Sequence, residues 1–220
     1  MRIGIPLLPG SLFDDAARAV RIAGGEPVLL WYRDADLRGV DAVVVPGGAI
    51  YGNYLRVGAL ARTTPVIVAV IDAARQGLPV LGVGSGFHVL CEAGLLPGSL
   101  VANRNLRFVS RPHRFTVETA ATTWTPSFER GETLRLPVTT GAGQYLASEA
   151  ELDELENSGR VVLRFAGTNP TGAARGIAGV SNAAGNVVGL LPAPQNAVEP
   201  GFGPSTDGRG FFAPTLAVRA

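Results

Sequence analysis

The sequence Val80-Leu81-Gly82-Val83-Gly84-Ser85-Gly86-Phe87-His88 joins a short apolar run to a glycine-rich turn and then to an amphipathic segment. A β-branched apolar run that ends in glycines is typical of a buried parallel strand, and Phe87, Leu90, Cys91 and Leu95 follow with helical spacing. The stretch therefore predicts a strand that turns sharply into a helix, with Gly84 at the apex. Enzymes built on such an elbow carry their nucleophile at the apex, and glycine has no side chain to attack with.

Strand and helix patterns alternate over the first half of the chain. We expect strands at Arg2–Leu8, Pro27–Trp31, Ala42–Val45 and Pro79–Val83, and helices at Asp14–Ala23, Val66–Arg75 and Gly86–Ala93. Alternation of this kind predicts βαβ units, and hence an α/β fold with a doubly wound, mostly parallel sheet.

The second half of the chain shows antiparallel-looking strand patterns with one helix among them. The strands are expected at Arg114–Glu118, Leu134–Val138, Arg160–Phe165, Gly176–Ser181 and Asn186–Leu191. The helix should begin with a capping box formed by Ser148 and Glu151 and end at Gly159. The Pro- and Gly-rich stretch Pro192–Gly210 is expected to be a long surface loop.

Length and composition favour a single domain. The 220 residues suit one α/β domain spanning residues 1–220, and 46% hydrophobic residues are enough to fill its core. Charged residues make up only 17%, which suggests a surface buried against another protein. The arginines are spread along the chain and the net charge is +1, so no basic cluster indicates nucleic-acid binding.

Targeting signals and cofactor motifs are not evident. Met1 leads directly into a strand and no apolar run reaches the length of a membrane span, so we expect a soluble, cytoplasmic protein without membrane contact. The single cysteine excludes an internal disulfide, and His88 and His113 lack a cysteine partner at ligand spacing. No metal or cofactor is implied.

Several motifs carry a resemblance to a known family. They are Pro9-Gly10-Ser11, Pro46-Gly47-Gly48, Tyr51-Gly52-Asn53-Tyr54-Leu55-Arg56, Leu90 to Gly98, Arg175 to Gly179 and Ser205-Thr206-Asp207-Gly208-Arg209-Gly210. From Met1 to about Phe212 the chain resembles PurQ, the class I glutamine amidotransferase subunit of phosphoribosylformylglycinamidine synthase. The resemblance implies the flavodoxin-like variant of the α/β fold. Within these motifs only Asn53 departs, since the family has aspartate there.

The resemblance also locates a catalytic triad whose residue types this chain lacks. The family cysteine falls on Gly84, and its Pro-His-Pro-Glu segment falls on Pro192-Ala193-Pro194-Gln195. Glycine, alanine and glutamine cannot serve as nucleophile, base and orienting carboxylate, so Gly84, Ala193 and Gln195 are expected to be vacated catalytic positions. The family stretch His-Gly-Glu-Gly-Arg-Tyr has likewise become Thr140-Gly141-Ala142-Gly143-Gln144-Tyr145.

Two other uses of this site remain open. Ser85 and His88 could form a relocated nucleophile and base, although Ser85 more naturally caps the helix and no carboxylate is placed to orient His88. Alternatively, the backbone N–H groups around Gly47, Gly48, Ser85 and Gly86 could still bind an anion or a carbonyl oxygen, which would make the chain a small-molecule binding protein, or they could simply hold water. Cys91 is expected in the core, and His113 at the surface or a strand edge.

The resemblance implies a protein partner. PurQ subunits supply ammonia to the ATP-dependent synthetase PurL, so we expect a catalytically empty subunit that associates with a PurL-like synthetase in purine or purine-derived metabolism. The expected interface residues are Tyr51, Asn53, Tyr54, Arg56, Asp207 and Arg209, because these polar motifs are kept while the catalytic ones are not. Well-made turns would explain the same motifs without a partner.

Overall fold

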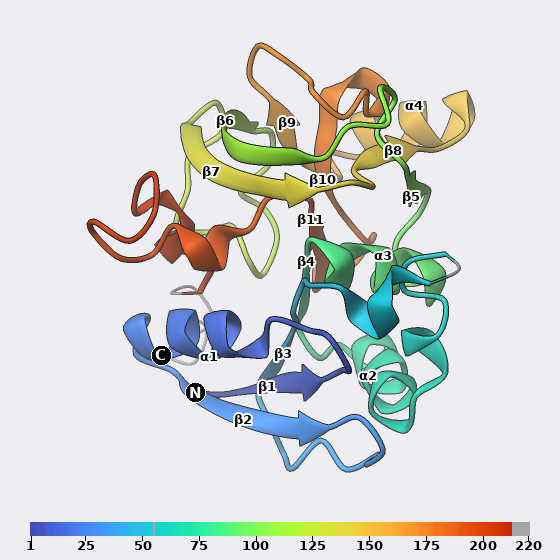
Figure 1. Ribbon diagram of the computed structural model, residues 1–220, viewed down its shortest axis with the longest axis vertical. Helices are drawn as coiled ribbons and strands as arrows, with labels where there is room; N and C mark the ends of the chain where they lie inside the picture. The colour runs from blue at the N-terminus through green and yellow to red at the C-terminus, as the bar shows by residue number, and fades with distance from the viewer. Residues whose placement is uncertain (55, 213–220) are drawn as a thin grey trace.

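A single mixed sheet runs through the whole computed structural model, which describes residues 1–54 and 56–212. Within these residues the sheet has nine strands in the order β2-β1-β3-β4-β11-β10-β9-β6-β7, and β5 and β8 form a separate pair (Figure 1). The strands are β1 (Arg2–Leu7), β2 (Glu26–Trp31), β3 (Ala42–Val45), β4 (Val80–Val83), β5 (Ser99–Val101), β6 (Val109–Val117), β7 (Thr133–Thr140), β8 (Gln144–Leu146), β9 (Val161–Phe165), β10 (Ile177–Ser181) and β11 (Val187–Leu190).

The first half of the chain builds the parallel part of the sheet, as the alternating pattern predicts. β1 pairs in parallel with β2 and β3, and β3 pairs in parallel with β4. Every residue of β3 and β4 is buried, which is why these strands consist of apolar residues and one glycine without a polar alternation. The helices α1 (Phe13–Ile22), α2 (Pro65–Arg75) and α3 (Ser85–Glu92) follow within a residue of their predicted limits.

The second half adds the antiparallel strands and one return to the parallel sheet. β6, β7, β9 and β10 pair antiparallel to one another in sheet order, and β11 is antiparallel to β10 but parallel to β4. The pattern of the sequence did not indicate that last pairing, nor the short pair β5–β8. Helix α4 (Glu149–Asn157) begins with the predicted capping box between Ser148 and Glu151.

Helix α3 lies directly on the strands that carry the elbow. A methyl group placed on Gly86 would come within 2.1 Å of the Val45 carbonyl oxygen, and one on Gly189 within 2.1 Å of the Phe87 ring. Only glycine permits this close approach of helix and sheet. The packing fixes the first turn of α3 against the carboxyl ends of β3, β4 and β11, where ligands bind in open α/β sheets.

Two predictions from the sequence are wrong in detail. The stretch Pro192–Gly210 is not simply a surface loop, because it contains a short 3₁₀-helix at Pro194–Asn196, the start of another at Asp207–Phe211, and buried residues between them. His113 is not a surface or strand-edge residue, because it lies buried inside β6, edge-on to the Phe165 ring. Segments distant in sequence bury His113 and parts of this loop. Local sequence patterns do not predict such burial.

Residues 1–54 and 56–212 contain no helix that combines the length and apolar character needed to cross a lipid bilayer.

Candidate functional site

The elbow after β4 has the backbone shape that the sequence indicates. Gly84 has φ 54° and ψ −116°, a conformation that side-chain-bearing residues adopt only under strain. Its N–H donates to the Leu190 carbonyl at 2.8 Å, which ties the elbow to the end of β11. A methyl group on Gly84 would meet only the Gly47 Cα, at 3.7 Å. The position therefore has room for a side chain. Glycine is favoured there because it adopts these backbone angles without strain.

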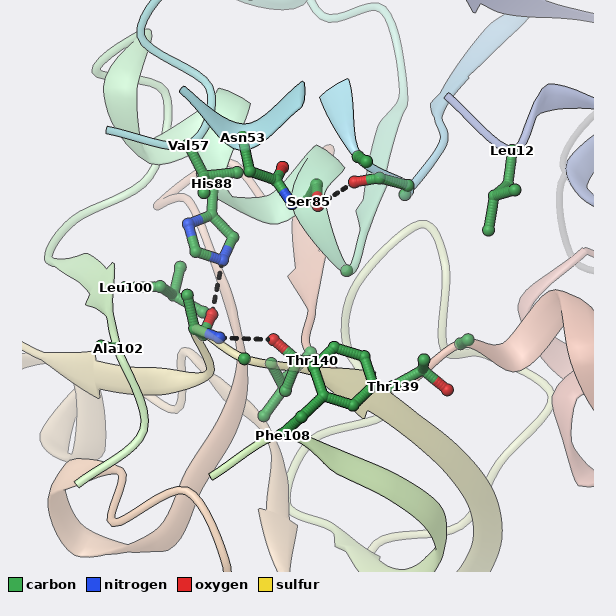
Figure 2. Close-up of a pocket in the computed structure, with 18 of the residues that line it drawn as sticks. Leu12, Asn53, Val57, Ser85, His88, Leu100, Ala102, Phe108, Thr139 and Thr140 are labelled. Atoms are coloured by element: carbon green, nitrogen blue, oxygen red, sulfur yellow. Dashed lines mark hydrogen bonds between the residues drawn. The ribbon is translucent and has the colours of Figure 1, made fainter. Parts of the chain in front are cut away.

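A cavity of about 780 Å³ opens at this elbow. Five parts of the chain form its wall: the loop between β1 and α1, the turn and loop after β3, the elbow with the first turn of α3, β5 with the connection to β6, and the segments at the ends of β7 and β11 (Figure 2). The lining residues include Leu12, Gly47, Gly48, Asn53, Arg56, Gly84, Ser85, His88, Phe108, Thr140, Gly141, Ala142, Ala193, Gln195 and Asn196. Its size suits a small molecule.

The three positions that the resemblance assigns to a catalytic triad lie in this one wall. Gly84, Ala193 and Gln195 all line the cavity, although the last two are more than a hundred residues from the first. None of them offers a nucleophile or a proton acceptor of useful basicity. The only cysteine of the chain, Cys91, is not a lining residue, and burial raises its thiol pKa far above the usual range.

Ser85 turns its hydroxyl toward the neighbouring turn. Its Oγ donates to the Gly48 carbonyl at 2.6 Å (Figure 2). The prediction that this hydroxyl caps α3 is wrong, because Gly84 occupies the cap position and no side chain accepts from the first turn. A serine whose proton is held by a carbonyl is not activated as a nucleophile, since activation needs a basic acceptor.

His88 is likewise committed to a carbonyl oxygen. Its Nε2 lies 2.7 Å from the Ala142 oxygen, and because a carbonyl only accepts, Nε2 carries the proton (Figure 2). Burial lowers the pKa of His88 to about 4, and the bond to Ala142 opposes this only in part. The ring is therefore neutral at pH 7. No hydrogen bond between His88 and Ser85 exists in the described part of the chain, so the geometry gives no support to a relocated Ser–His pair.

Backbone groups around the elbow are placed much as predicted, with one exception. The Pro46–Gly48 turn packs on the elbow, since a methyl group on Gly47 would lie 3.6 Å from the Ser85 nitrogen. Gly47, Gly48 and Ser85 line the cavity. Gly86 does not; it is buried against Val45.

The motif Tyr51–Arg56 lies at the cavity, although Leu55 falls outside the described residues. Asn53 and Arg56 belong to the wall, whereas Tyr54 points its ring into solvent. Tyr51 packs partly against the core, and its N–H donates to the Pro9 carbonyl. Arg56 forms a bidentate pair with Glu92, at 2.7 Å for both contacts.

The second predicted interface motif has a role inside the chain. The Asp207 carboxylate accepts from the Arg135 N–H at 2.6 Å, and the Arg209 guanidinium donates to the Val198 carbonyl. The first bond holds the segment after Pro192 onto β7, and the second joins two parts of that segment to each other. The retention of Asp207 and Arg209 therefore needs no partner to explain it, and a part in an interface remains a prediction.

Some residues of the site carry no recognisable signal in the sequence. Asn103 is fully buried; its side chain donates to the Arg107 and Thr140 carbonyls and accepts from the Gly143 N–H. It thereby fixes the two loops of the far wall. Phe108 lines the cavity from the same region. A single asparagine in a polar stretch gives no hint of such a role.

Within residues 1–54 and 56–212, no group of three or more histidine, cysteine, aspartate or glutamate side chains comes together.

Comparison with known proteins identifies the family of the chain. The model of the CobB/CobQ-like glutamine amidotransferase domain matches residues 1–209. The PurQ subunit of phosphoribosylformylglycinamidine synthase from Rhodococcus jostii is 56% identical over 98% of this chain and 96% of its own length, and that from Streptomyces coelicolor is 51% identical with the same coverage. The chain belongs to the PurQ family of glutamine amidotransferases.

Solved structures agree with this assignment to the PurQ family. A chain in the structure of PurLQS from Thermotoga maritima superposes with a TM-score of 0.90 at 35% identity, covering 98% of this chain and 97% of that one. The glutaminase domain of Trypanosoma brucei CTPS, solved with bound acivicin, shares the fold alone, with a TM-score of 0.65 at 13% identity. The predicted class I glutamine amidotransferase fold is thus confirmed.

Proposed function

We propose that this PurQ-family chain is a catalytically empty subunit that associates with a PurL-like ATP-dependent synthetase, in purine or purine-derived metabolism. The observation that carries the proposal is the composition of the cavity wall at the elbow. Gly84, Ala193 and Gln195 meet there without a nucleophile or a base.

The neighbouring polar side chains support the same conclusion. Ser85 and His88 are the remaining candidates for chemistry, and each donates its proton to a backbone carbonyl. An activated hydroxyl would instead donate to a basic nitrogen that a third group orients. The rival reading, an enzyme with relocated catalytic residues, therefore has no geometric support.

Association is supported by the relatives and by the surface near the cavity. The relatives are named as subunits of a synthase, and the solved relative is part of PurLQS. Large apolar side chains are exposed on the loops that supply the cavity wall: Leu106 is 82% exposed and Phe108 66%, with Leu12 and Tyr54 also open. Such side chains are more typical of a surface that a protein covers than of one left in water.

A glutaminase assay tests the empty site. Purified chain, alone or with a PurL-like synthetase, should release no glutamate from glutamine above background. The Ser85→Ala variant serves as the control, because it removes the one hydroxyl at the elbow. Glutamate release that disappears in Ser85→Ala would replace our proposal with the relocated-nucleophile enzyme.

Co-purification tests the association. The chain should co-elute with a PurL-like synthetase in size-exclusion chromatography, and Arg56→Ala should weaken the complex by roughly tenfold or more if Arg56 is an anchor of the interface. Arg75→Ala is the matched control, since Arg75 is 65% exposed against 68% for Arg56, also pairs with one carboxylate and lies outside the cavity wall. Failure to bind any such synthetase would favour the other rival, a small-molecule binding protein.

A further inference from the structure

The two terminal strands of the nine-stranded sheet, β7 and β2, differ in how their outer edges are covered. On β7, the Arg135 N–H donates to the Asp207 carboxylate at 2.6 Å, and the Arg135 carbonyl accepts from the Ser205 hydroxyl at 2.6 Å. β2 pairs with β1 on its inner side and ends the sheet on its outer side (Figure 1). An open outer edge is a template for pairing with another strand.

The alternation of β2 determines which backbone groups point to the outer edge. The Glu26 N–H donates to the Met1 carbonyl, on the side of β1. Successive residues of a strand direct their backbone groups to opposite sides, so Pro27, Leu29 and Trp31 direct theirs outward. Leu29 is 38% exposed and Trp31 47%, which leaves this edge open to solvent.

The outer edge of β2 offers a short set of donors and acceptors. Over residues 1–54 and 56–212, the N–H groups of Leu29 and Trp31 and the carbonyls of Pro27 and Leu29 have no hydrogen-bond partner. Proline has no N–H to offer. The Trp31 carbonyl already accepts from the Asp34 N–H at 2.9 Å. The edge therefore lacks one donor, at Pro27, and one acceptor, at Trp31.

This set of groups is complementary to itself. In an antiparallel pair with Leu29 opposite the Leu29 of a second copy, the two Leu29 residues exchange N–H and carbonyl bonds. Each Trp31 N–H then meets the Pro27 carbonyl of the other copy. The missing N–H of Pro27 falls opposite the Trp31 carbonyl, which Asp34 already occupies. Every open donor on the edge thus meets an open acceptor.

Other registers of the same pairing leave groups unmatched. If the second copy moves by two residues in one direction, the Leu29 N–H faces the occupied Trp31 carbonyl. If it moves by two residues in the other direction, the Leu29 carbonyl faces Pro27, which cannot donate. The register that places Leu29 opposite Leu29 is therefore the one that these backbone groups favour.

Side chains and charges agree with this register. It places Leu29 beside Leu29 and Trp31 beside Pro27 on one face, and apolar cross-strand pairs stabilise a sheet. The antiparallel direction also brings the end of β2 that carries Glu26 next to the end that is followed by Arg33 in the other copy. Glu26 and Arg33 are both exposed, so opposite charges meet at each end of the pair.

We propose that β2 pairs with β2 of a second copy of this chain about a two-fold axis, with Leu29 opposite Leu29, so that the two sheets become one continuous sheet. The inference goes beyond the proposed function and needs no synthetase. Because a single pair of short strands buries little surface, we expect a weak dimer with a dissociation constant on the order of 10–100 µM.

Sedimentation equilibrium of the full chain tests the dimer. From about 5 to 500 µM, the mean mass should rise from that of one chain toward that of two, as the expected dissociation constant requires. Leu29→Lys places like charges directly opposite each other and should weaken the dimer about tenfold or more. Leu146→Lys is the matched control, since Leu146 is also 38% exposed but lies on β8, outside the nine-stranded sheet.

Single cysteines test the register. Opposite residues of a hydrogen-bonded antiparallel pair have Cα atoms about 5.5 Å apart, within the reach of a disulfide, so Leu29→Cys should cross-link two chains under a mild oxidant. Trp31→Cys should not, because the two substituted positions would lie about 13 Å apart along the strands. The unmodified chain shows the background from Cys91, which is partly buried.

Several results would overturn the inference. A chain that remains monomeric at about 500 µM would do so, and would leave the edge to a strand of another protein. A dimer that Leu29→Lys leaves intact, or that Leu146→Lys disrupts equally, would place the contact on another surface. Cross-linking of Trp31→Cys as readily as Leu29→Cys would exclude the register. Because no synthetase is present, none of these results bears on the proposed association with a synthetase.

Discussion

At the scale of single residues, two departures from the family pattern lie in the same cavity wall, Gly84 where the family has cysteine and Ala142 where it has glutamate. The His88 ring also lines this wall and donates to the backbone carbonyl of Ala142. Neither departure leaves an ionisable side chain at its position, and burial keeps the neighbouring His88 ring neutral at pH 7.

Gly84→Ala should destabilise the protein by about 1–3 kcal/mol. The methyl group has room, but φ 54° and ψ −116° are strained for any residue with a Cβ. Urea unfolding measures the change. Gly141→Ala is the control, since it lies in the same wall without a positive φ and should stay within about 0.5 kcal/mol of the unmodified chain. If Gly84→Ala were as stable as the unmodified chain, the backbone of the elbow would not be strained.

His88 should make the protein sensitive to acid. Its pKa is about 4 in the folded chain against 6.5 when unfolded, so the unfolded state binds a proton more readily. The stabilisation by neutral His88 is complete above pH 6.5 and is lost as the pH falls toward 4, by roughly 3 kcal/mol. Denaturant titrations from pH 7 to 4 should show a shallower decline for His88→Gln.

The other histidine provides the comparison for this titration. Burial and the nearby Arg111 also lower the pKa of His113, so its contribution has the same sign. His113→Gln should retain the part of the acid sensitivity that belongs to His88. An unchanged pH profile in His88→Gln would contradict the assignment of a buried, neutral ring.

At the scale of elements, the helices are positioned by features that short stretches of sequence encode. Pro65 stands at the first position of α2, and Ser148 and Glu151 close the capping box of α4. α4 also carries Glu149, Asp153 and Glu156, which all pair with Arg175 at the turn before β10. Because these ion pairs are exposed, they contribute little to stability. Their role is to define where α4 lies relative to Arg175.

Ser148→Ala should cost about 1 kcal/mol of folding stability. The Ser148 hydroxyl accepts from the Glu151 N–H, and the Glu151 carboxylate accepts from the Ser148 N–H, so the substitution leaves an unpaired donor at the start of α4. Calorimetry should show a decrease in Tm of about 2–4 °C. Ser110→Ala, on an exposed position of β6, should leave the Tm unchanged. Equal Tm values for Ser148→Ala and Ser110→Ala would show that the capping box does not stabilise the protein.

At the scale of the whole molecule, one sheet brings together residues from both halves of the chain. β4 carries the elbow, and β11, which pairs with it in parallel, leads directly into the segment of Ala193 and Gln195. The Ser205–Arg209 motif holds that segment onto β7. The cavity therefore exists only when the complete sheet is formed.

Restoring the family residues should restore chemistry only when all three are present. Gly84→Cys alone should remain inactive toward glutamine, because no base generates the thiolate. The triple variant Gly84→Cys, Ala193→His, Gln195→Glu should release glutamate at least about 10²-fold faster than the single variant, since triad members act as a unit. Activity of the single variant would show that another group in the wall serves as base.

The sequence by itself determined the strand–elbow–helix at Gly84, the parallel first half, the α4 capping box and membership of the PurQ family. These features depend on periodicity and on turn residues, which act between near neighbours. It also identified Gly84, Ala193 and Gln195 as the positions of the family's catalytic triad, although only by resemblance.

Only the tertiary structure decided which groups the residues of the site contact. Segments far apart in the chain supply the hydrogen-bond partners of His88 and Ser85. They also supply the burial of His113 and the parallel pairing of β11 with β4. Such contacts depend on which side chains the completed sheet and its loops bring within hydrogen-bond distance, and residue spacing carries no record of that. Local pattern fixed the elements, and long-range pairing fixed the cavity between them.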